Sequence, residues 1–532
     1  MTSNRLKKHL LRGSGVLVTL IFLYACSGGT ISTGVEGDSA LNGDHVVDLA
    51  ISSKVPGDLP ADASEADLAR FAWNSFFALN WEASWGVTND PNKGMRGTPS
   101  ANWEFSSGGT GPDLTVWETY VHRLELTNSG ASTSLPDYKT KSTIDDNGLT
   151  LGNYWNVLDE DNEIGSCYLF AYDEAQVMYM AKANIAEYTY LDTARHNSLD
   201  NILRVKNLQN TVIDKKGTKA GLNTVAYDSL VADYLGPLTT SAEPFCDNDT
   251  LLCLPCGQSE TEGTYQEGAI EIKTAWRKLI PSKGDVASRF ITRDVVVFEK
   301  KADGTGKAVK ETFGLIGFHI IHKTHNYPSF IFASFEQVDV RDAQMTTIAL
   351  NESTNGTPIV APGTVNNVID RAIPSTLQTV NTAAKSLITG TNSSSLLQYY
   401  QLIGVQGQPV DYTNKASDDN YFMANYVIES DTALTFFHGL FTDPFDASRS
   451  NVIDKNTTYN MGGCQGCHGR AQFSGEDFSF IAALSLVETD VDPYQTYSTA
   501  KAAAASGTAP VISKVMSKGD IEKLKKYLAE ND

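Results

Sequence analysis

The stretch "SRFITRDVVVFEKKADGTGKAVKETFGLIGFHIIHKTHNYPSFIFASFEQVDV", Ser288–Val340, carries the clearest strand pattern in the chain. Its three runs of β-branched and aromatic residues are separated by the turn-forming sequences "KADGTGK" (301–307) and "HNYPS" (325–329). Short connections of this kind join neighbouring strands of an antiparallel sheet. We therefore expect three adjacent antiparallel strands, a β-meander, near residues 288–340.

Helical patterns occur on both sides of this meander. In "ADASEADLARFAWNSFFALNWEA", residues 61–83, apolar residues recur every three or four positions, and Asp62 or Ser64 can cap the helix. The chain ends in "SKGDIEKLKKYLAEND", residues 517–532, which has the pattern of an amphipathic helix. Helices together with an antiparallel sheet indicate the α+β class. The segment "LTVWETYVHRLEL", residues 114–126, predicts a short helix. The segment "CYLFAYDEAQVMYMAKANIAEY", residues 167–188, predicts an apolar run followed by a helix.

The segment "NMGGCQGCHGRAQF", Asn460–Phe473, contains the spacing C-x-x-C-H. This spacing is the attachment signature of c-type haem, in which two thiols form thioethers and the following histidine ligates the iron. We therefore expect one covalent haem c, attached through Cys464 and Cys467, with His468 as the proximal iron ligand. The other ring nitrogen of His468 should donate to a backbone carbonyl, which fixes the tautomer.

The sixth position of the iron separates two functions. A methionine or histidine there gives an electron carrier, whereas an open position allows chemistry on peroxide, O₂ or a small organic substrate. Met516, 48 residues after His468, is one candidate for the distal ligand. His319 and His322 are the others; on a regular strand they point to opposite faces, so at most one of them faces a given haem. His325 and His438 are two further histidines that we consider as candidates for the distal ligand.

The N-terminus has the features of an export signal. Four basic residues precede an apolar run from Val16 to Leu23, which is too short to span a membrane. "LYAC" then resembles the lipobox of bacterial lipoproteins, so we expect a signal peptide over 1–25 and lipidation of Cys26. The polar residues 26–60 read as a tether. Ser27 after the cysteine favours sorting to the outer membrane in a cell with two membranes.

The remaining cysteines are even in number, which in an exported protein suggests two disulfides. Three pairings are possible, and the sequence does not select among them. Cys253 and Cys256 form a C-x-x-C without a following histidine, so they also allow a redox dithiol or part of a metal site. The four cysteines concerned are Cys167, Cys246, Cys253 and Cys256.

The chain is acidic, with a formal net charge of −21 over 532 residues. An acidic surface argues against nucleic-acid binding and against electrostatic docking on anionic lipid. It is compatible with a basic redox partner protein, and equally with a solvated surface that has no partner. Contact with a membrane is therefore expected only through the lipid anchor.

Seven stretches together resemble a family of large exported bacterial proteins with a single haem, the "cytochrome c family protein" group. The resemblance spans most of the mature chain and implies a bacterial exported haem protein; it implies no substrate. The stretches are "FAWNSFFALNW" (71–81), "VWETY" (116–120), "IEIKTAWRKL" (270–279), "GLIGFHIIHKT" (314–324), "FIFASFEQVD" (330–339), "YYQLIGVQ" (399–406) and "NTTYNMGGCQGCHGRAQ" (456–472).

The sequence thus predicts an α+β protein with a large mixed domain over 61–450 that contains the meander. A small, mostly helical, cytochrome c-like module is expected over 451–532. The preferred function is one-electron transfer in the cell envelope by a lipid-anchored monohaem cytochrome. The alternative is an open-site haem oxidoreductase with a pocket between the two domains, and a third possibility is a surface-binding lipoprotein whose haem is structural.

Overall fold

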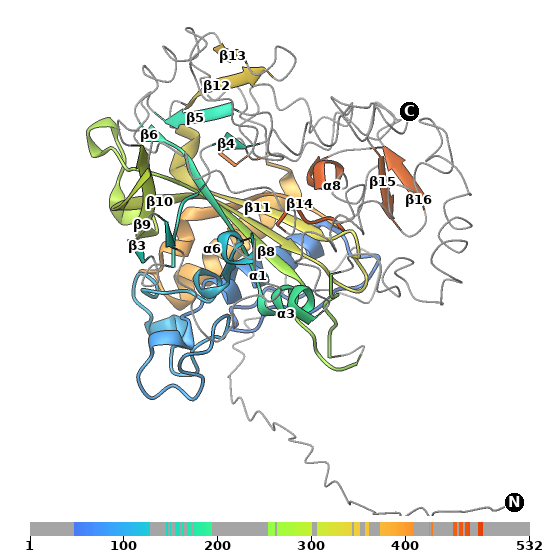
Figure 1. Ribbon diagram of the computed structural model, residues 1–532. Coiled ribbons are helices and arrows are strands. Elements are labelled where there is room, and N and C mark those ends of the chain that lie inside the picture. The colour runs from blue at the N-terminus through green and yellow to red at the C-terminus, as the bar shows by residue number, and fades with distance from the viewer. Residues whose placement is uncertain are drawn as a thin grey trace, which may run out of the picture.

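The computed structural model shows helices packed on a large antiparallel sheet, with a second, smaller sheet at one end (Figure 1). This bears out the α+β class. The residues that it describes are 47–127, 145–146, 149–150, 155–159, 162–163, 167–171, 175–193, 254–260, 263–300, 306–342, 345–351, 357–360, 373–407, 425, 427–428, 451–454, 457–460, 463–468 and 477–481.

The larger sheet has seven strands in the order β1-β7-β8-β10-β11-β14, with β9 paired to β10. The predicted meander is confirmed, because β9 pairs with β10 and β10 pairs with β11, both antiparallel. Strand β8 pairs with the edge of β10 that faces away from β11. The meander is therefore extended by strands from distant parts of the chain. The strands are β1 (Val121–His122), β7 (Met178–Ala183), β8 (Ile270–Arg277), β9 (Thr292–Lys300), β10 (Gly306–His322), β11 (Ile331–Gln337) and β14 (Tyr400–Gln406).

The register between β10 and β11 defines the two faces of this sheet. His319 lies opposite Ser334, and Ile321 lies opposite Phe332, so these four residues share one face. We call it the motif face, because the segment with the C-x-x-C-H motif packs there. The alternate positions of β10, which include His322, point to the other side, which we call the helix face.

Two helices cover the helix face (Figure 1). Helix α1 (Glu65–Leu79) begins at Ser64, one of the two predicted caps, and Asp67 completes a capping box. Its apolar side packs against β10, β11 and β14. Helix α6 (Ser375–Thr391) lies against α1 and β14, in a stretch where the sequence predicted no regular element.

The smaller sheet has the order β13-β12-β5-β4, with β6 paired to β5. It joins a segment before residue 180 to one after residue 340. Its strands are β4 (Asn162–Glu163), β5 (Cys167–Ala171), β6 (Ala175–Gln176), β12 (Met345–Asn351) and β13 (Thr357–Val360). Two hairpins complete the strands described: β2 (Asp145–Asp146) with β3 (Leu149–Thr150), and β15 (Asn451–Asp454) with β16 (Thr457–Asn460).

Residues 47–60 pack on the core, although their composition predicted a tether up to residue 60. Val55 and Leu59 are buried among the core side chains. The backbone N–H of Ala50 donates to Oδ1 of Asn74 in α1 at 2.9 Å. The tether prediction is therefore wrong for these residues, because their scattered apolar side chains find partners that lie far away in the sequence.

Two segments differ from their predicted secondary structure. The expected short helix at 114–126 consists of a 3₁₀ turn η3 (Trp117–Thr119), strand β1 and helix α2 (Arg123–Thr127). In the segment 167–188, three strands come first, and helix α3 (Ile185–Thr193) begins only after Asn184. Strand β7 pairs with β8, nearly ninety residues further along the chain. Long-range pairing of this kind overrides the local periodicity.

Candidate functional site

Helix α8 (Gly463–His468) carries the C-x-x-C-H motif and contacts β14 (Figure 1). The side-chain amide of Gln465, which lies between the two cysteines, donates to the carbonyls of Ser329 (3.2 Å) and Phe330 (2.9 Å). The backbone N–H of Gln465 donates to Oε1 of Gln406 in β14 at 2.9 Å. Gln465 therefore fixes the motif to the large sheet, although it occupies one of the two positions of C-x-x-C-H at which any residue type is allowed.

His468 is the last residue of α8, and one hydrogen bond orients its ring. Nδ1 donates to the carbonyl oxygen of Phe478 at 2.9 Å. This is the backbone hydrogen bond that the sequence predicted, and it leaves Nε2 as the nitrogen with the lone pair. Burial lowers the pKa of His468 to about 4, against the Phe478 hydrogen bond, which raises it. The ring is therefore neutral at pH 7, the state in which imidazole binds a metal.

Apolar and aromatic side chains surround the motif. The His468 ring lies 4.8 Å from the ring of Phe332 and 5.0 Å from that of Phe480, between centroids. Cys464 is buried in an apolar cluster that also contains Phe332, Phe330 and Phe478. Side chains of this kind suit the apolar faces of a porphyrin and limit the access of water to it.

The segment 477–481, which supplies the Phe478 carbonyl, is held in place by Asp477. The Oδ2 atom of Asp477 accepts a hydrogen bond from Nζ of Lys323 at 2.7 Å. The Lys323 side chain is only 2% exposed, so this is a buried ion pair whose disruption would leave an uncompensated charge. The orientation of His468 thus depends on a lysine that directly follows β10.

The two strand histidines lie on opposite faces of the sheet, as the strand period predicts. His322 is on the helix face, where Nε2 donates to the carbonyl of Glu267 at 2.6 Å and the ring packs on Phe71 of α1 at 5.3 Å. Burial lowers its pKa to about 4. His319 is buried on the motif face, opposite Ser334. Of these two residues, only His319 shares a face with α8.

Two buried carboxyl groups lie next to the segment 477–481. Burial raises the pKa of Glu271 in β8 to about 7, against hydrogen bonds with Ser479 and Glu187 that lower it. Burial and the adjacent Glu271 also raise the pKa of Glu187 in α3. The two side chains therefore hold at least one proton near neutral pH, close to the motif.

Several predicted residues lie outside the described part of the chain. Cys256 is described, in the segment 254–260. The backbones of Cys167 and Cys467 lie in β5 and α8, but their side chains are not described. The lipid anchor, the disulfides and the terminal helix stay predictions. The residues outside are the signal peptide (1–25), Cys26 with the tether up to residue 46, Cys246, Cys253, His438, Met516 and 517–532.

The described residues contain no group of three or more His, Cys, Asp or Glu side chains placed to hold a metal ion. No helix in the same part of the chain is long and apolar enough to cross a membrane.

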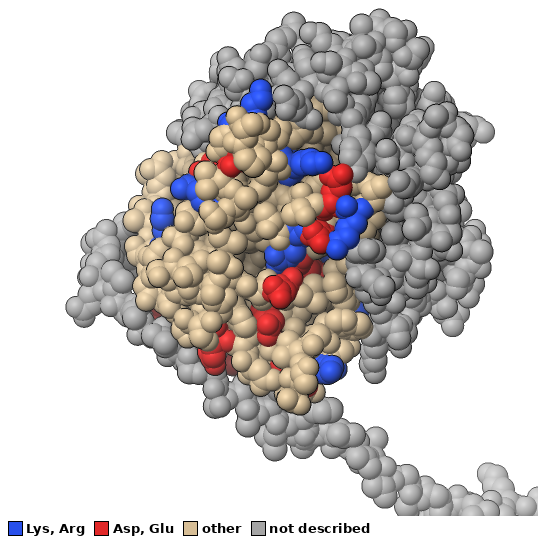
Figure 2. All heavy atoms as spheres, turned by 90° about the vertical axis from the view of Figure 1, so that its left-hand side faces the viewer, with Lys and Arg blue, Asp and Glu red and all other residues tan. Residues whose placement is uncertain are grey.

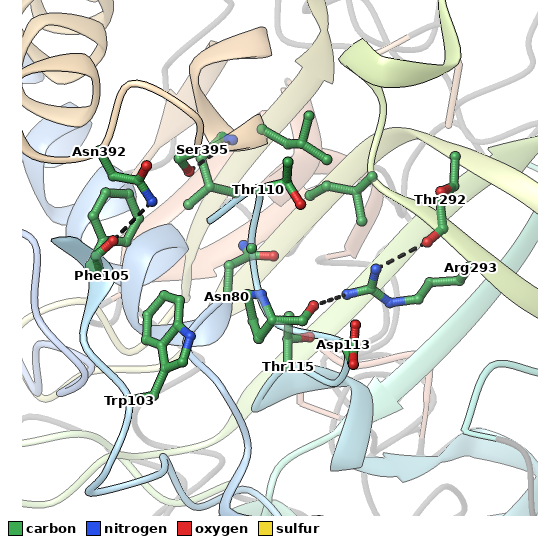
Figure 3. A pocket seen from close by; sticks show the side chains of 15 residues that line it. Asn80, Trp103, Phe105, Thr110, Asp113, Thr115, Thr292, Arg293, Asn392 and Ser395 are labelled. Atoms are coloured by element: carbon green, nitrogen blue, oxygen red, sulfur yellow. Dashed lines mark hydrogen bonds between the residues drawn. The ribbon is translucent and has the colours of Figure 1, made fainter. Parts of the chain in front are cut away.

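A cavity of about 210 Å³ is present, between residues 80–115, 291–293 and 392–397 (Figure 3). All three segments belong to the expected large domain, so this cavity is not a cleft at the expected boundary near residue 450.

Both acidic and basic side chains are present on the face of the molecule seen in Figure 2. Ion pairs at or near the surface include Lys278–Glu311, Lys310–Asp294 and Arg289–Asp339, each at 2.6 Å. The described part of this face has no large patch of one sign, although the chain as a whole is acidic. It therefore gives no electrostatic reason to place a docking surface for a partner there.

Comparison of the chain with protein-family models, with curated proteins and with solved structures found no match in any of the three. A functional assignment therefore depends on the residues and geometry of this chain. The sequence identified the motif residues, but it did not identify Gln465, Asp477 or Lys323. The last two are brought to the site by contacts more than 150 residues apart, and no local pattern marks them.

Proposed function

We propose that Cys464, Cys467 and His468 attach one haem c and that the protein transfers single electrons. The observation that carries this proposal is the hydrogen bond from His468 Nδ1 to the Phe478 carbonyl. It fixes the tautomer of the imidazole, which burial keeps neutral, so that Nε2 is available as an iron ligand directly after a C-x-x-C pair on a short helix.

The residues present fit this group. A bound haem c would supply an iron that changes its charge by one electron. The chain provides the ligand nitrogen of His468, the apolar side chains around Cys464 and the anchor at Gln465 that holds α8 on the sheet. Rigid support of this kind suits electron transfer, because it limits structural change between two oxidation states.

For the sixth position we propose His319 in preference to His322. His319 lies on the motif face, whereas Nε2 of His322 is engaged with Glu267 on the helix face. Met516 remains the alternative ligand. We further propose the segment 451–532 as the haem-bearing part of the chain. We also propose an exported, lipid-anchored protein with a lipidated Cys26 and a redox partner protein.

The test is an absorption spectrum of the full chain matured with haem c, oxidised and dithionite-reduced, with and without CO. We expect haem that resists acid–acetone extraction, and a low-spin reduced spectrum that CO leaves unchanged. Haem that is extractable, or that stays attached after Cys464 and Cys467 are both replaced by Ser, would refute the attachment. A high-spin spectrum that changes at once with CO would replace electron transfer with the open-site oxidoreductase.

Variants then identify the sixth ligand. His319→Ala should make the reduced haem bind CO, because the position opposite His468 is opened. The matched control is His325→Ala, since His325 is exposed and lies past the end of β10. CO binding by Met516→Ala, with none by His319→Ala, would assign the position to Met516 instead.

A further inference from the structure

The cavity described above is built by three segments that are distant in sequence. They are the loop after α1 (80–115), the start of β9 (291–293) and the turn between α6 and β14 (392–397). Figure 3 shows their side chains arranged around the opening. Nothing in the proposed electron transfer uses this cavity.

The walls of the cavity are tied together by hydrogen bonds. The side-chain amide of Asn392 donates to the carbonyls of Phe105 (2.9 Å) and Gly109 (2.8 Å), and the backbone N–H of Leu396 donates to the carbonyl of Thr110 (3.0 Å). The cavity is therefore held open by its own framework, as is usual for small-molecule sites.

Among the described residues that line the cavity, Arg293 is the one cation, and its charge is already neutralised. Arg293 forms two hydrogen bonds with the buried carboxylate of Glu118 (2.9 and 3.1 Å) and further bonds with the carbonyls of Pro112 and Thr292. Burial raises the pKa of Glu118, but the charge and hydrogen bonds of Arg293 act against burial, and the pKa is lowered overall. Both side chains are therefore charged, and their charges cancel. The carboxylate of Asp113 also lines the cavity. A phosphate or carboxylate ligand would find no uncompensated positive charge here.

The polar groups that remain for a ligand both donate and accept. The hydroxyl of Thr110 can do both, and Asp113 accepts. The Ser395 hydroxyl already accepts from the N–H of Leu397 at 3.3 Å and keeps its proton to donate. In the described part of the chain, Nε1 of Trp103 makes no hydrogen bond, and Figure 3 shows this indole at the side of the cavity. Alcohol groups on a ligand match such a set, because each hydroxyl is a donor and an acceptor at once.

Trp103 provides the apolar surface. Its ring is held by edge-to-face contacts with Trp81 (4.7 Å) and Phe105 (6.0 Å). Gly108 packs directly on the indole, because a Cβ there would lie 2.2 Å from Cζ2 of Trp103. The apolar side chain of Leu396 also lines the cavity. A ligand is thus required to present C–H groups as well as hydroxyls.

We propose that this cavity binds a neutral sugar ring, either free or at the end of a longer glycan. A six-membered sugar ring has apolar C–H groups for Trp103, hydroxyls for Thr110, Ser395 and Asp113, and a size that suits about 210 Å³. Its lack of charge agrees with the neutralised Arg293. The lining of the site does not include any residue of the C-x-x-C-H motif, so the proposal does not depend on haem attachment.

The test is titration calorimetry on the purified full chain with glucose, galactose, mannose and N-acetylglucosamine, and with a β-linked disaccharide of whichever binds. Glucuronate and hydroquinone are the charged and aromatic comparators. We expect millimolar binding of at least one neutral sugar and weaker binding of glucuronate, which the carboxylate of Asp113 repels. Tighter binding of the disaccharide would indicate a glycan end, and equal binding a free sugar.

Variants locate the binding. Trp103→Ala should weaken it about tenfold through the lost aromatic contact. Thr110→Val, at an exposed position, should weaken it several-fold without disturbing the core. The matched control Trp85→Ala removes an indole that packs on Trp155, outside the cavity, and should leave binding unchanged. Absence of binding by all four sugars, stronger binding of either comparator, or binding that Thr110→Val and Trp103→Ala leave intact would overturn the proposal.

Discussion

Several buried side chains on the two faces of the large sheet have pKa values that differ from those in water. His468 and His322 are neutral because burial lowers the pKa of each to about 4. Glu271 shows the opposite case, since burial raises its pKa to about 7. A carboxyl whose pKa is higher in the folded than in the unfolded chain destabilises the fold once it must ionise.

The pH dependence of stability follows from this shift of the Glu271 pKa. Below its ordinary pKa of 4.5, the carboxyl is neutral in both states and imposes no penalty. Between pH 4.5 and 7 the unfolded chain releases the proton first, so stability is lost as pH rises through this window. Glu271→Gln should therefore stabilise the protein at pH 8, by on the order of 2 kcal/mol, and have little effect at pH 4.5.

Urea unfolding of both proteins at the two pH values measures this difference. Glu104→Gln, at an exposed carboxylate, is the matched control and should show no such pH-dependent gain. An equal effect of Glu271→Gln at pH 4.5 and 8 would show that its carboxyl does not titrate abnormally in the folded protein.

At the scale of elements, α8 depends on the chain that leads into β11. Phe330 has φ of +65°, a left-handed conformation that is unusual for an aromatic residue. Its carbonyl and that of Ser329 both accept from the side chain of Gln465. The side chain of Gln465 therefore joins α8 to this strained turn, in addition to the turn's own backbone hydrogen bond from Phe330 to Tyr327.

Gln465→Ala tests this dependence. It removes the donor from two buried carbonyls, so we expect a loss of about 2 kcal/mol in stability and a lower yield of attached haem. Limited proteolysis should also cut sooner near residues 463–468. Gln398→Ala is the control, because its amide also donates to two carbonyls but lies near the surface. Equal losses for the two variants would contradict a special role of Gln465.

At the scale of the whole molecule, the N-terminal segment 47–60 is held where three backbones meet. A Cβ on Gly257 would lie 2.2 Å from the carbonyl oxygen of Gly57. The N–H of Gly257 donates to the carbonyl of Lys323, and its own carbonyl accepts from the N–H of His325, both at 2.9 Å. The segment just after β10 is therefore packed against two chain segments that are far from it in sequence.

Gly257→Ala should destabilise the protein by about 3 kcal/mol, because the added methyl group collides with backbone atoms that have no rotamer to change. Gly390→Ala is the matched substitution: Gly390 is in α6, and an added Cβ meets nothing within 4 Å. It should stabilise the protein by about 0.5–1 kcal/mol through helix propensity. Thermal unfolding monitored by circular dichroism compares them, and a Gly257→Ala variant as stable as Gly390→Ala would refute the close backbone packing.

Features that depend on neighbouring residues were predicted correctly from the sequence. The meander β9–β10–β11, the helix starting at Ser64 and the opposite orientation of His319 and His322 all follow from a side-chain period or a cap. The C-x-x-C-H spacing is also a local pattern, and the haem attachment inferred from it stays a prediction. The backbone carbonyl expected as the partner of His468 is that of Phe478. Each of these properties shows in a pattern of neighbouring residues, so it can be predicted without knowledge of the fold.

Other features required the folded chain. The sequence left open whether His319 or His322 faces α8, because the answer depends on which face the chain after residue 450 packs against. Likewise, β7 forms a strand because β8 pairs with it, and residues 47–60 pack on partners that are distant in sequence, such as Asn74 of α1. The cavity at Trp103 combines three segments almost 300 residues apart. Contacts between distant residues are set by the packing of the whole chain, and no local pattern records them.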